Sequence, residues 1–272
     1  MLGLRKRPGE TVNGPLTQGD DLRALLADVA AGRTTIDDAA AGLAALGLVT
    51  IDDFACLDVG RAQRKGVPEI VFGAGKTVDQ FAAIVASFAA AAPSVVASKV
   101  SAEQAAAVAA PAGGSLEWHE RARVLVVRRA DWRAPESHGV VGVLAGGTSD
   151  VGVADEAAIV CREMGVQVLT AYDVGVAGIH RLGHPLRDMT AAGAGAFVVA
   201  AGMEGALPSV VCGLVEAPVI GLPVSTGYGI GGRGEAALLG MLQSCSPGLS
   251  VVNIDNGVGA GVTAALIVRR MP

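Results

Sequence analysis

The sequence has few aromatic residues and few cysteines. Aromatic residues make up 3% of the 272 residues, although 51% are hydrophobic and 38 are glycine. Thin layers of Ala, Val and Gly are typical of parallel α/β proteins. The four cysteines, at positions 56, 161, 212 and 245, form no CxxC pair. This spacing argues against a disulfide framework and against a structural zinc site.

The sequence also lacks a long run of one charge and a long apolar run. It has 21 basic and 26 acidic residues, a net charge of −5, and no basic run longer than positions 5–7. Binding to nucleic acid or to anionic lipid is therefore not expected. The first residues form no apolar signal segment, and the alanine-rich stretches are interrupted before about 18 residues. We expect a cytoplasmic protein that acts on a small molecule, without a membrane or nucleic-acid partner.

The first half predicts a small α/β domain. Residues 1–20 are polar and contain Gly and Pro, which predicts a flexible tail. Residues 21–135 then alternate helical and strand patterns, with expected helices at 21–31, 35–47, 77–92 and 101–109 and expected strands at 69–73, 94–100 and 123–129. The polar, turn-rich segment 131–139 predicts the domain boundary.

The second half, residues 136–272, is more regular. Five short apolar runs predict buried strands, at 140–145, 166–171, 196–201, 218–224 and 249–255. Helix-length segments follow them, at 153–164, 175–192, 204–215, 234–243 and 260–269. This alternation predicts a doubly wound parallel sheet with helices on both faces. Ligands of such sheets bind beyond the carboxyl ends of the strands, near the switch in strand order.

The loop GGTSD, residues 146–150, follows the first of these strands and opens a helix. Its amides and hydroxyls, including those of Gly147, can bind a phosphate or a carboxylate at the positive end of the helix. Alternatively, Thr148, Ser149 or Asp150 only caps the helix. The loop contains neither a Walker motif nor a GxGxxG fingerprint.

Later loops supply further polar candidates. Asp173, His180 and Arg181 lie in one loop and can converge on an anionic substrate, although a lone histidine is more often structural. Glu204 lies in the apolar passage AAGMEGALPSVV. It is either a partner of a helix dipole or a carboxylate that carries protons.

The cysteines differ in their surroundings. Cys212 and Cys161 have apolar neighbours typical of a core, and Cys56 has no polar context. Cys245 lies in the turn MLQSCSPG, where a thiol can be exposed close to helix amides. The sequence pattern leaves open whether Cys245 packs or acts as a nucleophile.

Several long motifs resemble the LarB family, whose C-terminal domain is related to the PurE aminoimidazole ribonucleotide carboxylases. The motifs are GGTSDVGVADEAAIVCREMG, YDVGVAGIHRL, AAGMEGALPSVVCGLVEAPVIGLPVSTGYG and LQSCSPGLSVVNIDNGVGAG, with LDVGRAQRKGVPEIVFGAGKT upstream at 57–77. The resemblance covers about residues 54–265. It implies a PurE-like, flavodoxin-like C-terminal domain after a smaller α/β N-terminal domain.

The resemblance also implies an activity. LarB proteins carboxylate C5 of the pyridinium ring of nicotinic acid adenine dinucleotide with CO2 or bicarbonate, and hydrolyse its phosphoanhydride. The products are pyridinium-3,5-biscarboxylic acid mononucleotide and AMP, the first step towards the nickel pincer nucleotide of lactate racemase. The nucleophile of the family maps to Cys245 and its acidic residue to Glu204.

Further roles are assigned to other residues of this sequence on the same interpretation. Asp173 and His180 are secondary catalytic candidates. The expected substrate-binding residues are Gly147, Thr148, Ser149, Asp150, Arg181, Gly202, Asp255 and Lys76. Lys76 would reach the substrate from the first domain, although a lysine in a loop is usually only solvated. The resemblance implies Mg²⁺ on the phosphates, with no metal ligand assigned, and a homo-oligomer such as an octamer of PurE-type cores.

Two differences from PurE bear on the substrate. The PurE segment SAHRTP is replaced by TAYDVGVAGIHR, and the histidine just before LP is Ala206. A PurE-type carboxylase or mutase acting on an aminoimidazole ribonucleotide is one alternative. A non-catalytic nucleotide-binding regulator is another.

Overall fold

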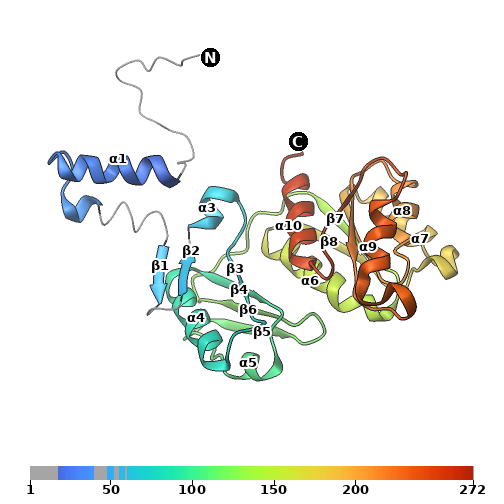
Figure 1. Cartoon of the computed structure of the whole chain (residues 1–272), viewed down its shortest axis with the longest axis horizontal. Coiled ribbons are helices and arrows are strands. Elements are labelled where there is room, and N and C mark those ends of the chain that lie inside the picture. Colours follow the sequence, from blue (N-terminus) through green and yellow to red (C-terminus); the bar gives the residue numbers. More distant parts are fainter. Residues whose placement is uncertain (1–17, 40–47, 52–54, 59, 272) are drawn as a thin grey trace, which may run out of the picture.

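Two α/β parts lie next to each other (Figure 1). The computed structural model describes residues 18–39, 48–51, 55–58 and 60–271. The elements of the N-terminal part are α1 Gln18–Ala30, β1 Leu48–Ile51, β2 Ala55–Asp58, α3 Arg61–Lys65, β3 Ile70–Phe72, α4 Val78–Ala91, β4 Ser94–Ser98, α5 Ala102–Ala106, β5 Ser115–His119 and β6 Val124–Arg128.

A mixed four-stranded sheet, in the order β3-β4-β6-β5, forms the centre of the N-terminal part. β3 and β4 are parallel, whereas β6 is antiparallel to both of its neighbours. Phe81, Ile84 and Phe88 of α4 pack against one face of this sheet. Thr77 begins α4 with a capping box, in which its hydroxyl accepts from the Gln80 amide at 3.2 Å.

The boundaries differ from expectation in several places. Residues 18–20, predicted to belong to the tail, are the first residues of α1, and 1–17 lie outside the described residues. The expected helix at 35–47 begins with Thr35 as its cap, since the Asp38 amide donates to the Thr35 hydroxyl at 3.0 Å. Residues 40–47 lie outside the description. β1, β2 and β5 were not predicted, because short strands and edge strands give little apolar signal.

The C-terminal part is the doubly wound domain that the sequence predicts. Its elements are β7 Val140–Ala145, η1 Thr148–Asp150, α6 Val151–Glu163, β8 Gln167–Ala171, η2 Val176–Arg181, α7 Gly183–Ala191, β9 Ala194–Ala201, α8 Leu207–Cys212, β10 Val219–Pro223, η3 Gly229–Gly234, α9 Glu235–Leu242, β11 Leu249–Val251 and α10 Gly257–Val268. The five strands are all parallel, in the order β11-β10-β9-β7-β8. This is the flavodoxin-like order, with the switch between β7 and β9.

Two predicted elements of this part need correction. The helix expected over 175–192 is replaced by the 3-10 segment η2, which contains a non-helical residue at Gly178, followed by α7. The strand expected over 249–255 ends at Val251, so that residues 252–255 form a loop at the carboxyl edge.

Helices cover both faces of the parallel sheet, as expected. α6 and α10 pack on one face, against Val141, Val143 and Val198. α7, α8 and α9 pack on the other face, against Leu144 and Phe197. Successive residues of a strand point to opposite faces, so a strand buried on both sides is apolar throughout.

α6 also joins the two parts. Its Ile159 packs with Val96, Val124 and Val126 on the face of the N-terminal sheet opposite α4. Figure 1 shows α6 and α10 on the side of the C-terminal part that is turned toward the N-terminal part. α6 is therefore buried on two sides, and it connects both hydrophobic cores.

Candidate active site

A cavity of about 490 Å³ lies at the carboxyl edge of the parallel sheet. The loops after β7, β9 and β10, together with η2, surround it. It therefore lies at the switch between β7 and β9, where the topology predicts a ligand.

The loop of residues 146–150 forms one side of this cavity. The Asp150 carboxylate is 6% exposed and accepts from the Gly147 amide at 2.8 Å. Burial raises the pKa of Asp150, and the negative charge of Asp255 acts in the same direction, against the Gly147 and Gly202 amides that stabilise its charged form. Asp150 thus closes the loop instead of capping α6. Ser149 and Gly147 line the cavity, whereas Thr148 is exposed outside its lining.

An ion pair lies beside the cavity on the η2 side. Arg181 lines the cavity, and its Nη1 is 2.5 Å from Oδ2 of Asp173. Asp173 has a φ of 58°, which belongs to the left-handed region. His180 is exposed and is not among the residues that line the cavity. The structure thus brings Arg181 and Asp173 together and leaves His180 apart.

The loop after β9 supplies the third group. Glu204 is exposed and lines the cavity close to Ala206. Gly202 must be glycine, because a Cβ there would lie 2.2 Å from the carbonyl oxygen of Thr226. This close approach brings the loops after β9 and β10 together.

Cys245 lies in the turn between α9 and β11. It is exposed and does not line the cavity within one chain. Two serines fix the turn: Ser209 Oγ donates to Ser244 Oγ at 2.8 Å, and Ser246 Oγ donates to the Ser209 carbonyl at 3.0 Å.

The other described cysteines are buried. Cys212 donates to the Pro247 carbonyl at 3.2 Å, and Cys161 donates to the Gly261 carbonyl at 3.2 Å. Burial raises the pKa of Cys161 to about 12 and also raises that of Cys212. Neither thiol is suited to form a thiolate. The side chain of Cys56 lies outside the description.

Besides Thr148, two further predicted binding residues do not line the cavity. Lys76 belongs to the N-terminal part, where its Nζ donates to the Phe72 carbonyl at 2.7 Å. Asp255 lines a second cavity, of about 620 Å³, between the two parts. Phe72, Lys99 and Val258 also line this second cavity.

The arrangement of the His, Cys, Asp and Glu side chains bears on metal binding. Among the described residues, no three His, Cys, Asp or Glu side chains lie close enough to hold a metal ion. Mg²⁺ usually binds through one or two carboxylates together with substrate phosphates. The described side chains thus form no ready-made site of three ligands, an arrangement that is compatible with a magnesium ion carried by substrate phosphates.

The pattern of the sequence did not single out Tyr228, Lys99 or Glu156. Tyr228 lines the first cavity from a glycine-rich loop. Glu156 is an acid among the apolar residues of α6, and this pattern could have indicated a buried carboxylate. Nothing around Lys99 in the sequence indicated a contact with the other domain.

In the part of the chain that the structure describes, no helix is long and apolar enough to span a membrane.

Comparison with known proteins is consistent with this architecture. Residues 49–129 match the LarB/PurE-like N-terminal domain, and residues 140–271 match the AIR carboxylase domain. An uncharacterized protein of Methanocaldococcus jannaschii is 39% identical over 257 residues, which cover 93% of this chain and 99% of that protein.

Two N5-carboxyaminoimidazole ribonucleotide mutases match only about half of the chain. The protein from Methanocaldococcus jannaschii is 32% identical over 46% of this chain and 76% of its own length. The protein from Thermotoga maritima is 32% identical over 47% of this chain and 73% of its own length. The full-length relative and the two domain matches show that the chain belongs to the LarB family, in which a LarB/PurE-like N-terminal domain precedes an AIR carboxylase domain.

Proposed function

We propose that this protein carboxylates the pyridinium ring of nicotinic acid adenine dinucleotide at C5 and hydrolyses the phosphoanhydride of the product. The product is pyridinium-3,5-biscarboxylic acid mononucleotide, released together with AMP. The observation that carries the proposal is the exposure of Cys245, because the other two cysteines whose side chains the structure describes are buried.

Addition of a thiolate makes the pyridinium ring able to react with CO2. A pyridinium ring is electron-poor and does not attack CO2. When the Cys245 thiolate adds to C4, the ring becomes a neutral dihydropyridine, and C5 becomes an enamine-type carbon nucleophile. The C5–CO2 bond then forms. The proton on C5 passes to a base, and expulsion of the Cys245 thiolate from C4 restores the aromatic ring.

Glu204 is the base in this proposal. It lines the cavity on the loop after β9, where a carboxylate can accept the C5 proton. Arg181 and the amides of the 146–150 loop would bind a phosphate or the ring carboxylate at the other side of the same cavity. Asp173 would orient Arg181 through their ion pair.

A second copy of the chain would bring Cys245 to this cavity. After Glu235, the residues of α9 are apolar or glycine: Ala237 and Met241 are buried, whereas Leu239 and Leu242 are 65% and 62% exposed. A helix of this kind is usually covered. Cys245 lies in the turn that follows α9, and the exposed residues Tyr228 and Ile230 lie in the segment before α9. We therefore propose a homo-oligomer in which this face meets the cavity of a neighbouring copy.

Magnesium on the pyrophosphate would offset the charge that develops when water cleaves the phosphoanhydride. No step proposed for Cys245, Glu204 or Arg181 depends on it.

The test supplies labelled bicarbonate with nicotinic acid adenine dinucleotide, and separately with aminoimidazole ribonucleotide. We expect label in a pyridinium mononucleotide and release of AMP. Label only in the imidazole product would establish the PurE-type carboxylase alternative. The mutase alternative, which the similarity to the two curated mutases favours, needs N5-carboxyaminoimidazole ribonucleotide as the substrate, and its conversion would establish that alternative. Tight binding without AMP release would establish the non-catalytic regulator.

Cys245→Ala is expected to fold normally and to lose carboxylation by about 1,000-fold or more, as removal of a covalent nucleophile does. Cys212→Ala is the matched control, because Cys212 is buried; it is expected to retain activity and to lose about 1 kcal/mol of stability. Mass spectrometry of the intact chain with substrate would locate the adduct. An adduct on Cys212, or full turnover by the Cys245 variant, would refute the mechanism.

A further inference from the structure

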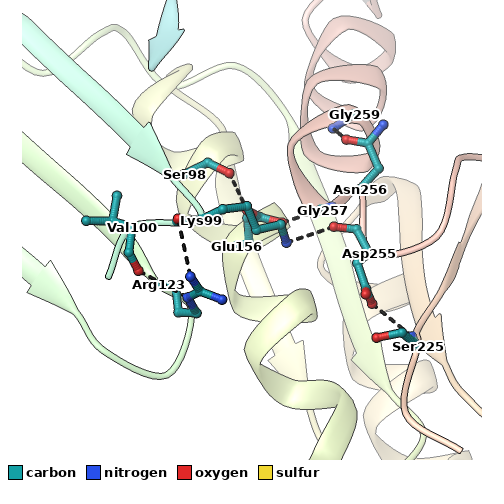
Figure 2. Close-up of polar contacts among 10 residues, drawn as sticks. All are labelled: Ser98, Lys99, Val100, Arg123, Glu156, Ser225, Asp255, Asn256, Gly257 and Gly259. Atoms are coloured by element: carbon teal, nitrogen blue, oxygen red, sulfur yellow. Dashed lines mark hydrogen bonds and ion pairs between the residues drawn. The ribbon is translucent and has the colours of Figure 1, made fainter. Parts of the chain in front are cut away.

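A buried carboxylate connects the two domains at a point that the proposed chemistry does not use. Glu156, on α6, is 0% exposed. Its Oε1 accepts from Ser98 Oγ at 2.6 Å, and its Oε2 accepts from Lys99 Nζ at 2.9 Å, both at the end of β4. Oε2 also accepts from the Gly257 amide at 3.1 Å, where α10 begins. Figure 2 shows Glu156 between the two domains.

Lys99 makes a second contact across the junction. Its Nζ donates to the backbone carbonyl of Asp255 at 2.8 Å, and Figure 2 shows the ammonium between Glu156 and this carbonyl. Lys99 and Asp255 have φ angles of 53° and 55°, in the left-handed region that non-glycine residues rarely adopt. Such conformations persist where surrounding contacts determine them, and they cluster at functional sites.

Asp255 also contacts the loop after β10, which forms part of the cavity at the carboxyl edge. Its Oδ1 accepts from the Ser225 amide at 2.9 Å. The neighbouring Thr226 contacts the loops after β9 and β7, since its carbonyl accepts from the Met203 amide at 3.2 Å and its hydroxyl donates to the Ser149 carbonyl at 3.5 Å. The loop after β10 is thus fixed between Asp255 and the two loops at the strand-order switch.

We propose that Lys99 is a positioning residue of the N-terminal domain, which fixes the backbone of Asp255 and, through it, the 225–228 side of the cavity. Thr226 and Tyr228 on that side line the cavity, whereas Lys99 does not. The N-terminal domain would then act on catalysis from a distance. This inference rests on the proposed function for the choice of substrate in the assay.

The variants must separate positioning from folding. Lys99→Met alone leaves the buried charge of Glu156 unpaired, which destabilises a protein strongly. The double variant Lys99→Met/Glu156→Gln removes both charges and still lacks the bond to Asp255. Lys99→Arg keeps the positive charge and is expected to restore part of the activity.

Arg121→Met is the matched control. Arg121 also reaches from the N-terminal domain to α6, where it pairs with Asp155 at 2.6 Å, next to Glu156. The Arg121 guanidinium contacts the Asp155 carboxylate and the ring of Tyr172. Loss of Arg121 therefore removes an interdomain ion pair without removing the restraint on Asp255.

The first measurement is hydrogen exchange of the 224–228 backbone in the full-length chain. We expect exchange about 10-fold faster in the double variant and unchanged in Arg121→Met. The second is steady-state kinetics with nicotinic acid adenine dinucleotide. Since a small misplacement costs up to about 100-fold in rate, kcat should fall by about 10- to 100-fold, with a smaller change in KM.

A folded double variant with the exchange rate and kcat of the parent would overturn the proposal. Equal effects of the double variant and Arg121→Met would also overturn it, because they would show only general docking of the domains. If the parent chain does not turn over the dinucleotide, the proposed function fails, and the exchange measurement still decides the role of Lys99.

Discussion

The surroundings of Asp150 determine the hydrogen bond and the pKa of its carboxylate. The carboxylate is buried at the cavity, closes the loop through the Gly147 amide, and has a raised pKa because burial disfavours its charge. The sequence made Asp150 a candidate cap of α6. In the structure its carboxylate accepts from the Gly147 amide and makes no cap hydrogen bond to α6.

The pKa of Asp150 leads to a prediction about stability. The folded state holds the Asp150 proton to higher pH than the unfolded state, whose value is 3.8. The free energy of unfolding therefore loses a contribution as pH rises through the interval above 3.8. Asp150→Asn keeps an acceptor for the Gly147 amide and cannot titrate. We expect the variant to become more stable relative to the parent as pH rises through this interval.

Urea unfolding of both proteins from about pH 4 to about pH 7 measures this difference. A stability difference that is constant across the range would contradict the shift assigned to Asp150. The control is Asp131→Asn, with the series extended below pH 3.8. The hydrogen bond from Arg129 lowers the pKa of Asp131, so the difference between that variant and the parent should change with pH in the opposite direction, and mainly at this lower pH.

At the scale of elements, α9 combines an apolar composition with exposed leucines. A single chain buries only some of the apolar residues of α9. Ala237 and Met241 are buried, whereas Leu239 and Leu242 are exposed. The closeness of this surface to Cys245 is the basis for a site completed by a second copy.

Replacing both exposed leucines tests this element. Leu239→Asp/Leu242→Asp should yield monomers in sedimentation velocity, because charge on the covered face opposes association. Carboxylation should fall by about 10-fold or more, since each Cys245 would lie apart from a cavity. Leu26→Asp, at an exposed leucine of α1, is the control and should leave the assembly intact. A leucine variant that is monomeric and fully active would contradict the shared site.

At the scale of the whole molecule, the two domains share a core. Ile159 of α6 lies among Val96, Val124 and Val126 of the N-terminal sheet, and Arg128 pairs with Glu163 of α6 at 2.5 Å. Separation of the domains would expose this apolar contact and the buried charge of Glu156.

The domains should therefore unfold together. The sequence has two tryptophans, Trp118 and Trp132, and Trp118 belongs to β5 of the N-terminal domain. Urea unfolding followed by tryptophan fluorescence should coincide with unfolding followed by far-ultraviolet circular dichroism, which reports both domains. A fluorescence transition at lower urea than the dichroism transition would show that the N-terminal domain unfolds on its own.

The regular C-terminal sheet was predictable because its strands are buried on both faces. Runs such as 140–145 and 196–201 are apolar throughout, and short loops separate them from their helices. The cavity residues Ser149, Arg181 and Glu204 could be predicted because the topology brings the carboxyl ends of parallel strands to one edge.

Other parts depend on contacts that local pattern does not encode. β5 lies at the edge of its sheet and alternates between exposed and partly buried residues, which weakens its apolar signal. The 3-10 segment η2 interrupts the helix expected at 175–192, because Gly178 takes a non-helical conformation there.

The sequence by itself determined the order of strands and helices in the C-terminal domain, the edge of the sheet where the polar loops gather, and the family to which the chain belongs. Only the tertiary structure decided that Lys99 meets Glu156 and Asp255, and that Cys245 lies outside the cavity of its own chain. The physical reason is separation along the chain. Periodicity reports which face of an element is buried, whereas Lys99 and Asp255 are 156 residues apart and meet only when two finished domains pack together.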